Sequence, residues 1–215
     1  MRVPAFTKPV RYAILVGGID PEQVGGKLGI PEMIDELEVE FKARGFRVVP
    51  MRENVQKESL DRLLEEAKRL SWESPRFPTT IFYYCGHHGI PGFGLNNGIY
   101  DRPDLMRKLL AIRGDKLGVF DCCHAGMMQQ YSGRELAIVA ATNEDYVAYA
   151  GRVDDSEKNR LLLSHEILKF MRSHPRQFPL GKMFQGIDRD IGITEWQNPE
   201  MKGSRVFIVP GRIYD

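Results

Sequence analysis

Two short clusters of cysteine and histidine are the features of this sequence that could carry out chemistry. The chain of 215 residues holds three cysteines and five histidines. All of the cysteines and three of the histidines lie in the segments Cys85-Gly86-His87-His88 and Cys122-Cys123-His124. The thiolate is the reactive form of cysteine, and a neighbouring imidazole can generate it. We therefore predict that Cys123 is a nucleophile and that His88, or alternatively His87, is its base.

The same residues could instead ligate a metal ion, because cysteine and histidine are the usual ligands of zinc. Their spacing argues against this alternative. Neighbouring residues of an extended chain point in opposite directions, so a His-His or Cys-Cys pair does not present both side chains to one ion. We expect no metal ligands and no bound cofactor.

The elements that must position the clusters are two predicted strands. Residues 79–85 (TTIFYYC) are rich in β-branched and aromatic side chains, and residues 116–122 (KLGVFDC) form a second apolar run, so each cluster stands at the carboxyl end of a strand. Further strands are predicted at 11–16, 46–51, 135–142 and 204–209. Apolar residues at helical spacing predict helices between most of these strands.

Strands that alternate with helices predict an α/β fold with a mainly parallel six-stranded sheet and helices on both faces. In such sheets ligands bind at the carboxyl ends of the strands. If the strands 79–85 and 116–122 are neighbours, the two clusters meet at that edge. The thiolate would then face an oxyanion hole, for which the backbone N–H groups of Cys123 and Gly89 are candidates.

The composition excludes several other classes of function. The formal net charge is +1 with 42% hydrophobic residues, which gives no basic footprint for nucleic acid or anionic lipid and is too apolar for a disordered chain. We expect no nucleic-acid partner and no membrane association. The odd cysteine count and the absence of a recognisable signal peptide predict a cytoplasmic protein. The length favours a single domain, 1–215, with a mobile loop over 148–160.

Three motifs resemble those of the caspase-like cysteine peptidases. The segment AILVGGID at 13–20 is similar to the family's first strand, YYCGHHG at 83–89 to its histidine motif, and DCCHAG at 121–126 to its cysteine motif. Gln197-Asn198-Pro199 followed by Gly203 is similar to a segment near the family's C-terminal end. Among these peptidases, the chain most resembles the metacaspases and the bacterial and archaeal caspase homologues.

The resemblance implies a caspase-hemoglobinase fold, in which 1–147 would be the part like the large subunit and 161–215 the part like the small subunit. It implies a cysteine-type endopeptidase with a Cys-His dyad and protein or peptide substrates. In metacaspases the aspartate two residues before the nucleophile helps to bind a basic P1 side chain. Asp121 occupies that position, so the resemblance predicts cleavage after Arg or Lys, with Asp145 adding acidity to the site.

Several alternatives stay open at this stage. Asp121 could instead cap the turn after its strand. A count from the tyrosines of the histidine motif selects His87 as the base, whereas the His-Gly dipeptide selects His88. Cys85 stands where the family has a serine, so the chain could also be a catalytically silent homologue that acts as an interaction or regulatory module. Calcium activation, for which Asp154 and Asp155 lie in a suitable loop, and the choice between monomer and homodimer are not decided by the resemblance.

Overall fold

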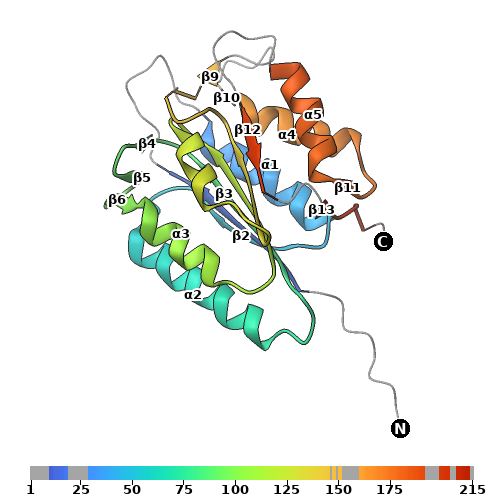
Figure 1. Cartoon of the computed structure of the whole chain (residues 1–215), viewed down its shortest axis with the longest axis horizontal. Coiled ribbons are helices and arrows are strands. Elements are labelled where there is room, and N and C mark those ends of the chain that lie inside the picture. Colours follow the sequence, from blue (N-terminus) through green and yellow to red (C-terminus); the bar gives the residue numbers. More distant parts are fainter. Residues whose placement is uncertain are drawn as a thin grey trace.

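The computed structural model describes residues 10–18, 29–145, 147–148, 150–151, 160–191, 199–203 and 207–213. Its centre is a six-stranded sheet in the order β12-β8-β7-β3-β1-β2 (Figure 1). The five parallel strands are β1 (Arg11–Gly17), β2 (Arg47–Met51), β3 (Thr79–Cys85), β7 (Asp115–Asp121) and β8 (Leu136–Ala140). The predicted mainly parallel six-stranded sheet is therefore confirmed.

The sixth strand differs from the prediction. It is β12 (Glu200–Lys202), which runs antiparallel to β8. In the described part of the predicted strand 204–209, which is 207–209, β13 (Ile208–Val209) is a strand, and it pairs with β11 (Phe178–Pro179) outside the central sheet. The short polar strand β12 lies at the sheet edge, where polar side chains face water, so it lacks the apolar signature from which strands are predicted.

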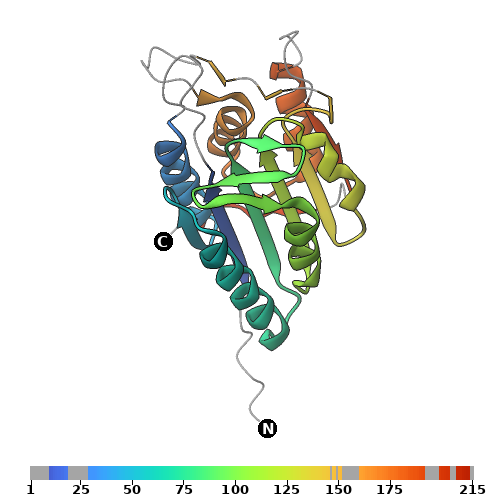
Figure 2. The same cartoon turned by 90° about the vertical axis from the view of Figure 1, so that its left-hand side faces the viewer.

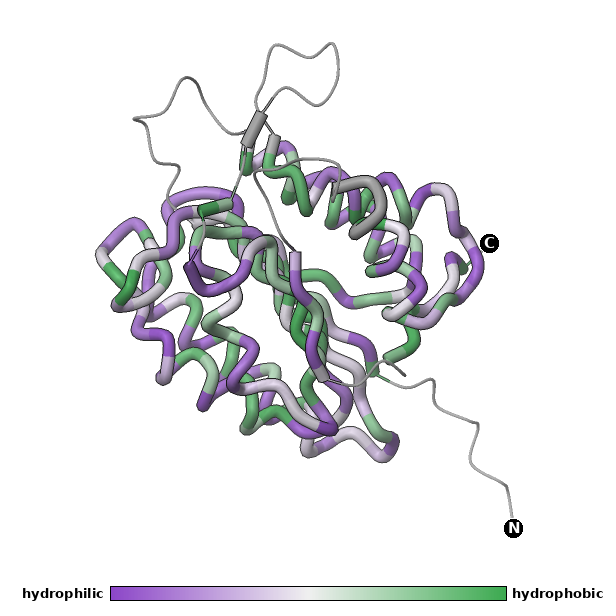
Figure 3. The backbone as a smooth tube through the Cα atoms, turned by 45° about the horizontal axis from the view of Figure 1, so that its top comes forward, coloured by the Kyte–Doolittle hydropathy of each residue, from purple (hydrophilic) through white to green (hydrophobic). Residues whose placement is uncertain are grey.

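The central strands alternate their side chains between two cores, which gives the sheet two buried faces. On β3, Ile81, Tyr83 and Cys85 face one core, whereas Phe82 and Tyr84 face the other. The strong apolar colour of the central strands in Figure 3 reflects this double burial. A fully buried strand reads as a continuous apolar run, which explains why β1, β3 and β7 were predictable.

Helices cover both faces of the sheet, as predicted. The helices α1 (Ile30–Ala43), α4 (Leu162–Ser173) and α5 (Leu180–Ile191) contribute to the core with Tyr83, whereas α2 (Lys57–Glu73) and α3 (Arg102–Ala111) contribute to the core with Tyr84. Figures 1 and 2 show the two groups of helices on opposite sides of the sheet. Among the described residues, no helix combines the length and apolar character needed to span a membrane.

The segment after β3 is more ordered than its glycine-rich sequence indicates. It forms a small antiparallel sheet of β4 (His88–Gly89), β5 (Gly92–Leu95) and β6 (Gly98–Asp101), which leads into α3. Gly92 has a φ of 157°, and a Cβ there would lie 2.1 Å from the Tyr100 carbonyl oxygen. Close packing of two backbones thus explains a glycine that the sequence alone suggested only as part of a loop.

The predicted loop over 148–160 lies mostly outside the described residues, and so do Asp154 and Asp155. At its two ends, β9 (Ala150–Gly151) and β10 (Arg160–Leu161) pair antiparallel. The Gln197-Asn198 part of the C-terminal motif is likewise outside the described residues.

Candidate active site

The two cysteine and histidine clusters lie side by side at the carboxyl edge of the sheet. Strands β3 and β7 are direct neighbours, and their parallel register places Cys85 opposite Asp121. The Nδ1–H of His88 donates a hydrogen bond to the carbonyl oxygen of Cys123 at 2.9 Å, which joins the segments that follow the two strands. The predicted convergence of the clusters is therefore present in the structure.

A sharp turn carries Cys123 out of the sheet. Cys122 is 1% exposed and belongs to the core, whereas Cys123 is partly exposed. His124 follows with a φ of 53° and precedes the seven-residue 3-10 helix η1 (Ala125–Tyr131). This left-handed conformation turns the chain directly after Cys123, and it is uncommon for a residue other than glycine. The thiol thus lies where the strand ends and the backbone turns.

Two contacts hold this turn against the loop after β8. The Nδ1–H of His124 donates to the carbonyl oxygen of Glu144 at 2.9 Å. A Cβ at Gly126 would lie 2.5 Å from the backbone nitrogen of Glu144, so only glycine permits this approach. The position of Cys123 therefore depends on packing between two loops.

The two histidines of the first cluster have different surroundings. His88 is 1% exposed, and its ring packs on Phe93 with the ring centroids 4.7 Å apart. Burial lowers its pKa from 6.5 to about 4. A carbonyl oxygen only accepts hydrogen bonds, so the bond from His88 to the Cys123 carbonyl fixes the proton of the imidazole on Nδ1. The buried Nε2 of His88 has no partner among the described residues. His88 is therefore a neutral, buried imidazole at pH 7.

His87, in contrast, is exposed. Its carbonyl oxygen accepts hydrogen bonds from the Tyr84 hydroxyl at 2.5 Å and from the Gly94 N–H at 2.8 Å, which fixes the backbone at this position. In the described part of the chain, no hydrogen bond joins the Cys123 Sγ to either imidazole. The structure thus brings both histidines to the same edge of the sheet as Cys123, with His87 exposed and His88 buried.

The other two cysteines are core residues. Cys85 and Cys122 are both buried, and burial raises the pKa of each thiol well above its ordinary value. Thiols in such surroundings stay protonated and unreactive. Their interpretation as packing residues is confirmed. Within the described ranges, no group of three or more histidine, cysteine or carboxylate side chains could hold a metal ion.

Asp121 is the last residue of β7, two residues before Cys123, and it is fully buried. Its Oδ2 accepts hydrogen bonds from the backbone N–H of Ser164 at 2.7 Å and from the Ser164 hydroxyl at 2.6 Å. Its Oδ1 has no partner among the described residues. Burial raises the pKa of Asp121 to about 6, although the two bonds from Ser164 act in the opposite direction. These contacts run to the first turn of α4 rather than to the turn that follows β7.

Asp145 lies at a different place on the same edge. It is exposed, and it lines a cavity of about 470 Å³ that does not include Asp121. The wall of this cavity also contains Glu144 after β8 and Glu200 on β12. Gly89 forms the first pair of the β4–β5 hairpin with Gly92. The assignment of Gly89 and Cys123 N–H groups to an oxyanion hole stays a prediction.

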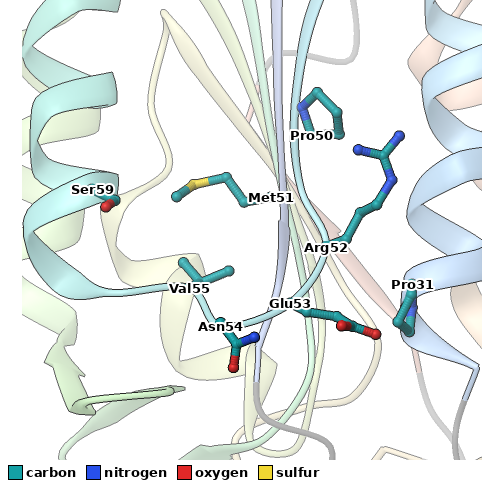
Figure 4. Close-up of a pocket in the computed structure, with 8 residues that line it drawn as sticks. All are labelled: Pro31, Pro50, Met51, Arg52, Glu53, Asn54, Val55 and Ser59. Carbon is teal, nitrogen blue, oxygen red and sulfur yellow. The ribbon is translucent and has the colours of Figure 1, made fainter.

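A second cavity, of about 580 Å³, lies at the end of β2 (Figure 4). None of the predicted site residues lines this cavity, and β1 lies between β2 and β3 in the sheet. Its Arg52 is already paired with Asp35 and Glu38 on α1. We therefore place the candidate active site at the ends of β3 and β7.

Sequence reasoning missed Ser164 and Tyr83 as parts of this site. Ser164 lies 43 residues after Asp121, and the Tyr83 hydroxyl donates to the Ser164 Oγ at 2.8 Å. No local motif in the sequence connects these residues. Only the packing of α4 on the sheet brings them together.

The six-stranded sheet with helices on both faces forms an α/β fold, and a comparison with solved structures shows that this fold is of the caspase type. The crystal structure of caspase-1 from Spodoptera frugiperda matches the chain with a TM-score of 0.71 and 11% sequence identity, over 95% of this chain and 91% of that chain. At this identity the likeness shows the fold alone. No protein-family model and no curated protein sequence matches the chain. The expected caspase-like fold is confirmed.

Proposed function

We propose that the protein is a cysteine endopeptidase in which Cys123 attacks the scissile carbonyl of a protein or peptide substrate. The observation that carries this proposal is the 2.9 Å hydrogen bond between His88 and the Cys123 carbonyl, because it joins the histidine segment to the cysteine turn at adjacent strand ends. Partial exposure of Cys123, beside two buried thiols, leaves this sulfur as the accessible nucleophile.

The reaction has two stages. The Cys123 thiolate forms a bond with the carbonyl carbon, and the electron pair of the carbonyl moves to its oxygen. Collapse of this intermediate breaks the C–N bond, and a histidine gives its proton to the leaving amine. Water then attacks the acyl-enzyme, the same histidine takes a proton from this water, and the C–S bond breaks to release the acid and the thiolate.

We assign proton transfer to His87, with His88 as the alternative. The sequence favoured His88, but that imidazole is buried, is packed on Phe93 and already donates its Nδ1–H to Cys123. A group that exchanges protons with a leaving amine and with water needs access to both. His87→Ala is expected to lose turnover by at least a hundredfold. His88→Ala is expected to lose less turnover than His87→Ala, because it only displaces the Cys123 carbonyl. A larger loss in His88→Ala than in His87→Ala would restore His88, the base that the sequence favoured.

We further propose that Asp121 recognises Arg or Lys at P1, as in the metacaspase-like branch of the family. Its carboxylate has one oxygen without a partner among the described residues, and an arginine could satisfy this oxygen with a charge-assisted hydrogen bond. Because Asp121 is fully buried, a P1 side chain reaches this oxygen only after the surrounding chain opens. Asp145 lies on another cavity, and we assign it a supporting electrostatic role.

The test is a panel of fluorogenic peptides with Arg, Lys or Asp at P1, assayed with wild type, Cys123→Ala and Cys85→Ala. We expect cleavage after Arg and Lys, its loss in Cys123→Ala and its retention in Cys85→Ala. Preference for Asp at P1 would contradict the specificity. The same assay with CaCl₂ or with a chelator tests calcium activation.

A catalytically silent homologue is the second candidate function. It is favoured by the lack, among the described residues, of a hydrogen bond between the Cys123 thiol and an imidazole. Catalytic hydrogen bonds often form only in the substrate complex, so this geometry does not exclude activity. If Cys123 belongs to an active dyad, iodoacetamide should alkylate it at pH 6 faster than it alkylates free cysteine. If Cys123 is not activated, its alkylation at pH 6 should be slower than that of free cysteine.

A further inference from the structure

We propose that Ser164, supported by Tyr83, positions Asp121 so that one carboxylate oxygen is held by the protein and the other is left for a basic substrate side chain. This inference rests on the proposed function and deepens it. Ser164 and Tyr83 would be specificity-determining residues that act through Asp121 without touching the substrate.

The three side chains come from three different elements and share one buried place. Tyr83 lies on β3, Asp121 at the end of β7 and Ser164 in the first turn of α4. Each residue has zero exposure. Water therefore does not compete for these hydrogen bonds, and their geometry is set by the packing of α4 on the sheet.

The direction of each hydrogen bond follows from proton counting. An ionised carboxylate only accepts, so the Ser164 hydroxyl uses its single proton on Asp121 Oδ2, at 2.6 Å. The Ser164 Oγ can then accept from the Tyr83 hydroxyl, at 2.8 Å. The Ser164 backbone N–H reaches the same Oδ2 at 2.7 Å. Two donors, both from Ser164, thus act on Oδ2, and the Tyr83 hydroxyl supports them through the Ser164 Oγ.

The other oxygen, Oδ1, is left without a partner among the described residues. A buried acceptor without a donor costs free energy, and a negative charge increases that cost. No ion pair to Asp121 occurs in the described part of the chain. A guanidinium or ammonium group would supply both the missing donor and the missing positive charge, so the arrangement matches an arginine or lysine side chain.

The groups around Asp121 do not supply that charge. Among the described residues, the titratable side chains that interact electrostatically with Asp121 are Tyr83 and Cys85 on β3 and Cys122, which directly follows Asp121. Burial raises the pKa of all three well above the ordinary values, so they are neutral at pH 7. From α4, the contact is made by Ser164, which is also neutral.

Asp121 in turn completes the start of α4. This helix begins at Leu162, and its N-cap residue Leu161 offers no side-chain hydrogen bond. The carboxylate accepts the N–H of Ser164, which has no acceptor within the helix, and it also complements the positive end of the helix dipole. The strand that leads to the nucleophile and the helix after residue 160 therefore hold each other in place.

The test compares Ser164→Ala, the conservative Ser164→Thr and Tyr83→Phe with wild type on peptides that have Arg at P1. Loss of a charge-assisted hydrogen bond predicts a fall in kcat/KM of roughly tenfold or more for Ser164→Ala, mainly through KM. Tyr83→Phe should show a smaller fall in the same direction, and Ser164→Thr should recover activity. If Ser164→Ala does not fold, Tyr83→Phe carries the comparison.

Two matched controls separate positioning from general damage. Ser71→Ala removes a buried serine hydroxyl on α2 that donates to the Lys68 carbonyl, and Tyr100→Phe removes a buried tyrosine hydroxyl that donates to Asp61. Both controls should keep the wild-type kcat/KM. The acidic limb of the pH profile of kcat/KM should move to higher pH only in Ser164→Ala and Tyr83→Phe. The hydrogen bond from the Ser164 hydroxyl lowers the pKa of Asp121, and this bond is lost in the first variant and weakened in the second.

A ¹³C NMR titration of the Asp121 carboxyl group, assigned with Asp121→Asn, gives a readout that does not need catalysis. Its midpoint should rise in Ser164→Ala. If wild type cleaves peptides but neither KM nor this midpoint changes in the variants, the positioning role is wrong while the proposed function stands. If wild type cleaves no peptide, the proposed function fails and the specificity role falls with it.

Discussion

The burial of His88 predicts a measurable loss of stability in acid. Its pKa falls from 6.5 to about 4 on folding because the buried imidazole resists protonation. The unfolded chain therefore binds the proton more readily than the folded chain. The stability that comes from the neutral ring is complete above about pH 6.5 and is lost as the pH falls through about 4.

The magnitude follows from the two pKa values. The difference between the pKa values of 6.5 and about 4 corresponds to roughly 3 kcal/mol, because each tenfold change in proton affinity is worth about 1.4 kcal/mol. At pH 5.0 only part of this stability is lost, and linkage gives a free energy of unfolding about 2 kcal/mol lower than at pH 7.5. This residue is 1% exposed, so solvent screening reduces the effect little.

Urea unfolding of wild type and His88→Asn at these two pH values tests the prediction. Asn removes the titration and keeps a side-chain N–H near the Cys123 carbonyl oxygen. The cavity that it leaves beside Phe93 affects both pH values alike, so the difference between the two proteins isolates the histidine. His87→Asn, at an exposed position, is the control and should behave as wild type.

The expected outcome is that wild type loses about 2 kcal/mol more than His88→Asn between pH 7.5 and pH 5.0. Asp121 works in the opposite sense, because its raised pKa makes the folded state gain stability on protonation. This contribution is shared by both proteins and cancels in the comparison. Equal losses in wild type and His88→Asn would refute the buried, neutral state of His88.

Three further predictions concern the site and its support. Iodoacetamide should modify Cys123 well before Cys85, and peptide mapping after limited labelling measures this; similar labelling of both would contradict the difference in their exposure. Arg44→Met should lower the free energy of unfolding by about 3–5 kcal/mol in urea titrations, since this fully buried guanidinium ties α1 to the end of α4 and to the C-terminal segment. Gly126→Ala should slow alkylation of Cys123 and destabilise the fold, because its Cβ would meet backbone at 2.5 Å, whereas Gly133→Ala, with open space around it, should change neither.

Much of the fold could be predicted because its signals are local. A buried parallel strand needs apolar side chains on both faces, and this requirement makes the runs that end at Cys85 and Cys122 recognisable. The strand β12 and the hairpin that begins at His88 could not be predicted in this way. The first lies at a polar edge, and the second is held by close backbone approach at glycine.

The sequence by itself determined which residues could react and at which edge of the sheet they would meet. The spacing of the two clusters after neighbouring strands was sufficient for that, since parallel strands end at the same edge. Adjacent residues such as His87 and His88 cannot be ranked by spacing, because they follow the end of the same strand by two and three residues. Packing on Phe93 decided which of them is buried.

Only the tertiary structure decided what holds Asp121. The contact with Ser164 joins residues 43 positions apart and arises from the docking of α4 on the sheet. Such a contact depends on the summed packing of two elements, and no local pattern of residue types records it. The sequence therefore indicated the candidate chemistry at the strand ends, and the packing determined which oxygen of Asp121 is held and which has no partner among the described residues.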